Sequence, residues 1–460
     1  MNYDLLKEID EYLGENLPSL KGKKFVIYNG DLEIRDKDKN TLYTLNNGSV
    51  YLSLLPKPKI YFKGDIVKGK LKKDLDSQEL YLYLPDFNPA KILVTGFKFS
   101  SNDGMSLSGI ITNAIEKSEQ EIDRLYFYIL NFDDTFGRGI RHENKLYSGR
   151  ITLNYDIWEI IIDKRPNHKF IYDWLKNTSL YEITHVGVIE RTDKQPFKPL
   201  DAEFLLNALF WLLSFARGRY IGIDILLGFR DEVCIWESIQ DLRVSNWDEG
   251  KITWFSKQHP EMLEKIFPLF INKLRDPLWG EHLLMALEWY IDSLEANIME
   301  ETFIWVSSAL ELISWIRFTQ EEFIISKDKY DKLYESDKIR LLLHDFGIPI
   351  KIPFNISPGY EDGPYLFTEI RNSIVHPVKK EKVNALSFDD RWKAHELGLW
   401  YLELTILRLL GYNGYYVNRL KSIDHSLWEG NIEKVPWYKD DEMSNKFYSL
   451  NYETQQRERN

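Results

Sequence analysis

One short segment, RNSIVHP at residues 371–377, carries side chains that could cut RNA. Arg371 offers a fixed positive charge that can hold a phosphate, and the imidazole of His376 can move a proton near neutral pH. Asn372 lies four residues before His376, so on a helix it is a neighbour that can orient the ring or the phosphate. RNA cleavage needs a base for the 2′-hydroxyl proton and an acid for the leaving 5′-oxygen. The segment therefore indicates phosphodiester cleavage without a metal.

A single histidine serves poorly as acid and base at once. The chemistry therefore favours a homodimer in which two copies of the segment meet. The spacing alone is weakly specific, because Arg275 with His282 and Arg419 with His425 are similarly spaced by coincidence. The RNSIVHP pair differs in having a polar residue after Arg371 and a proline that ends the helix. No histidine pair has the spacing of a zinc site on one helix, so we expect no metal and no other cofactor.

Other charged residues near the segment are secondary candidates. Lys379, Lys380 and Arg391 could add contacts to RNA phosphates, although a solvated loop explains the lysines at least as well and a solvated helix start explains Arg391 better. Glu311 could face the segment, either in an ion pair with an arginine or in catalysis. His395 lies near an apolar stripe and is better explained as a hydrogen-bonded core histidine.

The elements that must position the segment are helices. Gly363-Pro364 is typical of a helix start, and Leu366, Phe367, Ile370 and Ile374 then fall on one apolar face. Helical periodicity recurs on both sides of this helix, which predicts an antiparallel bundle with a central buried helix at residues 301–318. The other helices are expected at residues 262–274, 281–298, 337–346 and 389–410.

The first part of the chain has a different hydrophobic pattern. Short apolar runs separated by turn signals predict an antiparallel sandwich or barrel-like domain at residues 1–195. Residues 196–258 are interpreted as a connector with one helix and a small sheet, 259–430 as the helical bundle and 431–460 as a polar tail. The predicted fold class is therefore α+β and multidomain, with a β-rich, sandwich-like N-terminal domain followed by an all-α C-terminal bundle.

Composition limits the classes of function. The 460 residues are 44% hydrophobic, which is enough for packed cores, and the one cysteine, Cys234, fits a reducing cytoplasm without disulfides. No cationic, apolar leader or membrane-length run is visible, so we expect a cytoplasmic protein with no membrane partner. The net charge of −12 argues against broad nucleic-acid binding but permits a local cationic site.

The RNSIVHP segment resembles the arginine–histidine motif of the HEPN superfamily (higher eukaryotes and prokaryotes nucleotide-binding), most closely its ApeA-like prokaryotic group. The segment SALEL at residues 308–312, the long last helix and LGYNGYYVNR at residues 410–419 add to the likeness, which covers about residues 281–421. Members of this superfamily are helical bundles, commonly dimeric, and many are metal-independent ribonucleases of toxin, abortive-infection and antiphage systems.

The resemblance implies specific roles. Arg371 would bind phosphate, His376 would shuttle protons and Asn372 would orient, giving a 2′,3′-cyclic phosphate and a 5′-hydroxyl. It implies RNA, tRNA included, as substrate, and a phage-derived trigger or an antitoxin as further partners. Two alternatives stay open. One is a noncatalytic module that binds nucleotide, RNA or protein. The other is a β domain that binds carbohydrate or a phage protein on a bundle that only dimerises.

Overall fold

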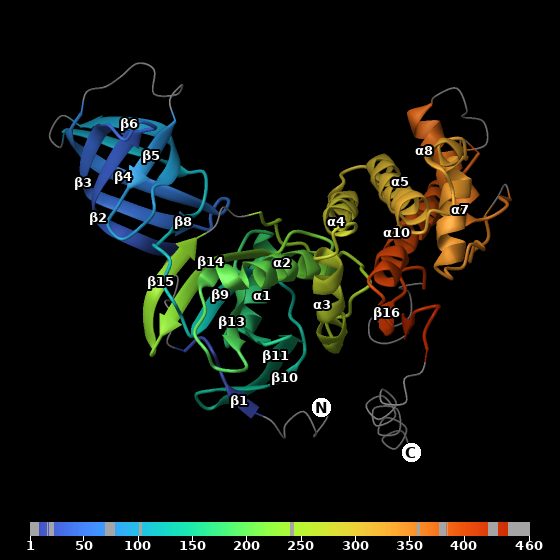
Figure 1. Ribbon diagram of the computed structural model, residues 1–460, viewed down its shortest axis with the longest axis horizontal. Coiled ribbons are helices and arrows are strands. Elements are labelled where there is room, and N and C mark those ends of the chain that lie inside the picture. Colours follow the sequence, from blue (N-terminus) through green and yellow to red (C-terminus); the bar gives the residue numbers. More distant parts are fainter. Residues whose placement is uncertain are drawn as a thin grey trace. The chain divides into compact units, whose positions relative to one another are not determined.

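The computed structural model describes residues 9–15, 17, 23–69, 79–100, 104–239, 243–356, 359–376, 383, 385–421 and 431–439. It divides into two compact units. The first comprises residues 1–252 and 257–272, and the second comprises residues 253–256 and 273–460. The N-terminal region is β-rich with several sheets and the C-terminal region is helical (Figure 1).

A closed six-stranded barrel forms the N-terminal part of the first unit, in blue in Figure 1. Side chains alternate along its strands, and the inward set, such as Ile34, Leu45 and Leu82, is fully buried. The barrel closes because β5 pairs with β2. The sequence predicted either a sandwich or a barrel-like domain, and the structure shows a barrel. In the order of the closed sheet, the strands are β2 (Lys24–Asp36), β3 (Thr41–Ser53), β4 (Lys59–Lys68), β7 (Gly104–Ile111), β6 (Ala90–Ser100) and β5 (Leu80–Tyr83).

An open nine-stranded sheet forms the rest of the first unit. Its order is β1 (Ile9–Glu11), β10 (Arg138–His142), β11 (Lys145–Tyr155), β12 (Trp158–Lys164), β13 (Ile183–Arg191), β9 (Arg124–Leu130), β14 (Gly222–Arg230), β15 (Val233–Ile239) and β8 (Ile115–Glu116). The helical elements here are α1 (His168–Thr178), η3 (Pro199–Ala202), α2 (Glu203–Arg217) and most of α3 (Glu261–Leu274).

The boundary expected at residue 195 falls inside this sheet. Strand β14 pairs with β9, so the segment interpreted as a connector with a small sheet instead supplies two strands of the large one. The residues of β14 are buried almost to its end, as is usual for a strand inside a large sheet. Helix α3 likewise groups largely with the first unit, so the bundle of the second unit begins near Lys273 rather than at residue 259.

Helix α2 also explains the most apolar part of the sequence. The stretch Pro199–Arg217 is the one described helix with the length and hydropathy of a membrane span, and 56% of that window is buried inside the fold. It packs against β14. Its apolar character is therefore accounted for by packing within the unit.

The second unit is a bundle around α5, which contacts α4, α7, α8 and α10. Residues such as Val306, Leu310 and Ile313 of α5 are fully buried, which confirms the prediction of a central buried helix. The predicted positions of the motif helix and the closing helix are also confirmed to within one residue. The bundle contains α4 (Gly280–Glu295), α5 (Met299–Ile316), η4 (Arg317–Glu321), α6 (Lys327–Tyr330), α7 (Glu335–Asp345), α8 (Gly363–Val375) and α10 (Phe388–Leu409).

Part of the expected polar tail belongs to the bundle. The strand β17 (Ile432–Lys434) pairs with β16 (Tyr415–Val417), and Trp437 donates a 2.8 Å hydrogen bond from Nε1 to the Tyr412 carbonyl. The tail therefore contributes structure up to residue 439.

Candidate active site at the end of helix α8

Helix α8 is fixed at its start by an acidic cap. The Asp362 side chain accepts a 2.8 Å hydrogen bond from the Tyr365 backbone N–H, as an N-cap residue does. The Arg340 guanidinium of α7 lies 2.6 Å from the same carboxylate, so the cap also joins α7 to α8. On the opposite side, α10 approaches closely at Gly398, where an added Cβ would lie 2.1 Å from the Phe367 ring. The position and direction of α8 are thereby set by two neighbouring helices.

The end of α8 presents His376 to solvent. The His376 backbone N–H still donates to the Asn372 carbonyl at 2.8 Å, but its φ of −121° and ψ of 89° leave helical geometry. The residue before a proline disfavours helical dihedral angles, which explains this exit. The side chain is exposed, as RNA cleavage would require. The following lysines, Lys379 and Lys380, lie outside the described residues.

Arg371 is held by an acid from the neighbouring helix. Its Nη1 lies 2.6 Å from Glu335 Oε1 of α7 and donates a 3.2 Å hydrogen bond to Asn372 Oδ1. The Arg371 side chain is 20% exposed to solvent. Both contacts use Nη1, and Nη2 makes no hydrogen bond to another described residue. Nη2 is thus the group through which a phosphate could be bound while the ion pair persists.

A second carboxyl group lies beside this ion pair. Burial raises the pKa of Glu311 on α5, and the neighbouring Glu335 carboxylate raises it further, against the opposing charges of Lys338 and Arg371. Within the described part of the chain, Glu311 Oε1, Glu335 Oε2 and Arg371 Nε are buried without a hydrogen-bond partner. Two adjacent carboxyl groups next to one arginine favour a single shared negative charge. The side chains of Glu311, Glu335, Lys338 and Arg371 thus form one group of charges in the bundle.

The structure does not join Arg371 to His376 directly. The contacts of Arg371 to described residues go to Glu335 and Asn372, and none goes to His376. Five residues on an ideal helix correspond to a rise of about 7.5 Å, and the backbone of His376 has already left helical geometry. Within one copy of the chain, no polar contact among the described residues brings the cation and the imidazole together.

The remaining candidates have structural partners. Arg391 donates from Nη2 to the Val383 carbonyl at 3.1 Å, so its role at the site is at least partly structural. His395 is buried, stacks on Trp392 at 5.0 Å and contacts Glu396 through Nδ1 at 3.0 Å, which confirms the interpretation of a hydrogen-bonded core histidine. Sequence reasoning identified Glu311 but missed Glu335, because a cross-helix partner leaves no signal in periodicity.

Buried Arg419 forms an ion-pair network within the bundle. Its Nη2 lies 2.8 Å from Glu403 Oε1 and its Nη1 lies 3.0 Å from Glu396 Oε2. These charges raise the pKa of Arg419 although burial opposes them, and burial raises the pKa of Glu403. Arg419 is therefore engaged inside the bundle and is not available for RNA.

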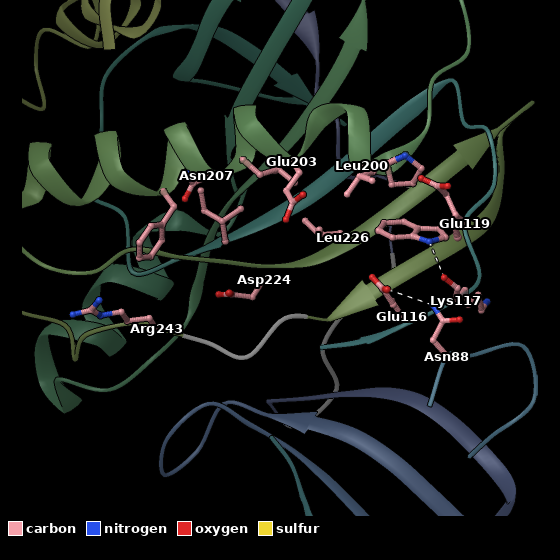
Figure 2. Close-up of a pocket in the computed structure, with 15 residues that line it drawn as sticks. Asn88, Glu116, Lys117, Glu119, Leu200, Glu203, Asn207, Asp224, Leu226 and Arg243 are labelled. Atoms are coloured by element: carbon pink, nitrogen blue, oxygen red, sulfur yellow. Dashed lines mark hydrogen bonds between the residues drawn. The ribbon is translucent and has the colours of Figure 1, made fainter. Parts of the chain in front are cut away.

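A cleft lies in the first unit. It has a volume of about 540 Å³ and is lined by α2, β14, β15 and the segment around residue 117. Figure 2 shows Glu203 of α2 pointing toward β14, where Asp224 and Leu226 lie. The lining residues include no histidine, serine or cysteine, so the cleft lacks a nucleophile–base pair. The carboxyl groups of Glu203 and Asp224 and the Arg243 guanidinium line it beside apolar side chains, so the cleft has a mixed polar and apolar lining.

A polar network lies near the middle of the nine-stranded sheet. Asp133 forms an ion pair with Arg217 at 2.8 Å, and the adjacent Asp134 forms one with Lys164 at 2.5 Å. His185 in β13 is fully buried, and burial followed by the charge of Lys164 holds its pKa well below the usual value. These contacts are inside the fold and fix its strands and loops.

Comparisons with known proteins match the two units of the structure separately. A family model described as the YopA central domain matches residues 117–250, and one described as the YopA C-terminal domain matches residues 276–433. The SPbeta prophage-derived uncharacterized protein YopA of Bacillus subtilis (strain 168) is 39% identical over 406 residues, which cover 85% of this chain and 90% of that protein. No solved structure matches the chain.

Proposed function

The chain belongs to the YopA family, and we propose that it is a metal-independent endoribonuclease with a HEPN-like bundle and a site at the end of α8. The observation that carries this proposal is the exposed His376 at the end of a helix that also holds Arg371 at the bundle surface. A proton-transferring ring and a fixed cation on one short, firmly positioned segment are the groups that RNA transesterification requires.

Arg371 would stabilise the charge that develops on the phosphate. Its Nη2 would donate to a phosphate oxygen, while Glu335 and Asn372 hold Nη1 and so limit the orientations of the guanidinium. His376 would take the proton of the 2′-hydroxyl or return one to the 5′-oxygen. The nucleophile is then the 2′-oxygen, the P–O5′ bond breaks, and the products carry a 2′,3′-cyclic phosphate and a 5′-hydroxyl.

The site would be completed by a second copy of the chain. Within one chain, no polar contact among the described residues brings Arg371 and His376 together, and a single histidine serves poorly as acid and base at once. A two-fold axis beside the end of α8 would bring a second arginine and a second histidine to the same groove, which also supplies separate acid and base.

The name of the relative supports a proposal for the biological setting. The printed name of the Bacillus subtilis protein describes it as prophage-derived. We extend this to propose that the present chain acts in the cytoplasm in a toxin, abortive-infection or antiphage system, where a phage-derived trigger or an antitoxin controls cleavage. RNA, tRNA included, is the proposed substrate.

The proposal is tested by the chemistry of the products. Purified full-length protein is incubated with 5′-labelled RNA in EDTA, and the product ends are identified by their need for a phosphatase that opens cyclic phosphates before end-labelling. Cleavage in EDTA with a cyclic phosphate supports the proposal. Cleavage that requires added Mg²⁺ or leaves a 3′-hydroxyl would reject it. Intact RNA with retained RNA binding would favour a noncatalytic binding module instead.

A further inference from the structure

Five outward-facing apolar side chains lie in register across five strands of the barrel. Val26 of β2 pairs with Tyr51 of β3, Tyr51 pairs with Tyr61 of β4, Tyr61 pairs with Ile110 of β7, and Ile110 pairs with Leu93 of β6. With strands about 4.8 Å apart, the row is about 19 Å long. These five residues are called the barrel band.

The barrel band faces away from the barrel core. Its neighbours along the strands, including Phe25, Leu52 and Phe62, are the buried residues that fill the interior. Val26 and Leu93 at its two ends are 55% and 46% exposed. At its centre the Tyr51 and Tyr61 rings stack with centroids 5.8 Å apart and an interplanar angle of 25°. The band therefore offers an aromatic platform with apolar ends.

Lysines border the band. Lys24 and Lys59 stand in the row on one side, and Lys63 stands in the row on the other side, where it pairs with Ser49 and Ser108. All three lysines are exposed and form no ion pair with any described residue. Lys24 Nζ lies 4.8 Å from the centroid of the Tyr51 ring.

The charge of the barrel is opposite to that of the chain. Residues 24–111 contain 13 Lys and Arg against 10 Asp and Glu, whereas the whole chain has a net charge of −12. An anionic partner is therefore attracted to this part of the molecule rather than to the rest of it.

We propose that the barrel band binds single-stranded RNA, with bases stacked on Tyr51 and Tyr61 and phosphates near Lys24, Lys59 and Lys63. Aromatic side chains flanked by cations are the common means of holding an unpaired strand, because every base has a face that stacks. A duplex hides those faces and fits such a platform poorly. The inference depends on the proposed function in one respect, because it takes the RNA strand bound by the barrel to be the substrate that the bundle cleaves.

Binding is measured apart from cleavage. Full-length His376→Ala protein is titrated with a fluorescein-labelled 12-nucleotide polyuridine, and anisotropy gives the Kd. The matched probes are polydeoxyuridine of the same length and a 12-base-pair RNA duplex. The single strands, RNA and DNA alike, bind more tightly than the duplex if stacking dominates. A duplex that binds as tightly as the single strand overturns the inference.

Variants identify the surface. Tyr51→Ala with Tyr61→Ala weakens binding of polyuridine at least about tenfold, whereas Tyr51→Phe with Tyr61→Phe keeps the stacking faces and changes the Kd by less than about twofold. Phe99→Ala, which removes a 68% exposed aromatic ring outside the band, is the matched control and binds like the parent. An unchanged Kd in the alanine double variant overturns the inference.

A lysine variant keeps the test decisive if the alanine pair misfolds. Lys24→Gln, Lys59→Gln and Lys63→Gln together make the slope of log K against log salt shallower by about 0.7 for each lysine that contacts a phosphate. An unchanged slope contradicts the inference. If the parent protein binds no RNA, the inference is also contradicted, and the barrel band would then be a surface for a protein partner.

The two proposals fail separately. Loss of RNA binding in the barrel variants together with no cleavage by wild type retains the barrel site and rejects the nuclease. Cleavage in EDTA that depends on His376, with RNA affinity unaffected by the tyrosine pair, retains the nuclease and rejects the barrel site.

Discussion

Glu335 Oε1 lies 2.6 Å from Arg371 Nη1, so an acid from α7 neutralises the cation that the proposed chemistry uses. The pair ties two helices together at the bundle surface and leaves the guanidinium with limited freedom. It also means that an incoming phosphate meets an arginine that is already oriented. The same contact therefore links the stability of the bundle to the geometry of its site.

Removing the acid should weaken the bundle. Glu335→Gln replaces the carboxylate that contacts the guanidinium with a neutral amide and is expected to reduce the free energy of unfolding by about 1–2 kcal/mol, between the values for exposed and fully buried pairs. Glu322→Gln is the control, because Arg317 keeps ion pairs with Glu321 and Asp345. Urea denaturation followed by circular dichroism measures both. Equal stability of the two variants would show that the Glu335 pair contributes nothing.

The raised pKa of Glu311 predicts a pH dependence. A carboxyl group whose pKa is higher in the folded state contributes stability below its unfolded pKa of about 4.3, and this contribution is lost as the pH rises through the folded value. Glu311→Gln cannot ionise and escapes that loss. Its Tm relative to wild type should therefore increase from pH 4 to pH 8. A difference that is constant over this range would contradict the assignment.

The close approach of α10 to α8 predicts sensitivity at one glycine. Gly398→Ala places a Cβ 2.1 Å from the Phe367 ring, and the ring or the helix must move. We expect a loss of about 1–3 kcal/mol in the free energy of unfolding. Gly359→Ala is the matched control, since no atom lies within 4 Å of its added Cβ. Thermal denaturation of the two variants checks this, and a tolerated Gly398→Ala would indicate looser packing than described.

The buried ion pair between Arg419 and Glu403 of α10 predicts a larger effect. Arg419→Ala leaves the fully buried Glu403 without its cation, which costs about 3–5 kcal/mol for comparable buried pairs. Replacing both residues, as Arg419→Met with Glu403→Gln, should recover most of this loss. Chemical denaturation of the single and double variants measures the coupling. A single variant as stable as the double one would argue against a coupled pair.

The sequence predicts those parts of the fold that depend on local pattern. Leu366, Phe367 and Ile370 share one apolar face, and they locate α8 to within one residue. Pairing between distant strands has no local signature, so neither the closure of β5 onto β2 nor the pairing of β14 with β9 could be predicted. The same limit applies to the site. His376 and Arg371 are visible in the motif, whereas Glu335 reaches Arg371 only through the packing of α7 on α8.

The most direct test compares two exposed histidines of the same bundle. His376 ends α8, and His344 lies in the last turn of α7, so His344→Ala controls for the loss of an exposed imidazole. Cleavage of labelled RNA is followed in EDTA under single-turnover conditions with wild type and both variants, after equal Tm values confirm folding. The account predicts that His376→Ala lowers the rate at least about 100-fold and that His344→Ala leaves it unchanged. A His376→Ala variant that cleaves at the wild-type rate would contradict it.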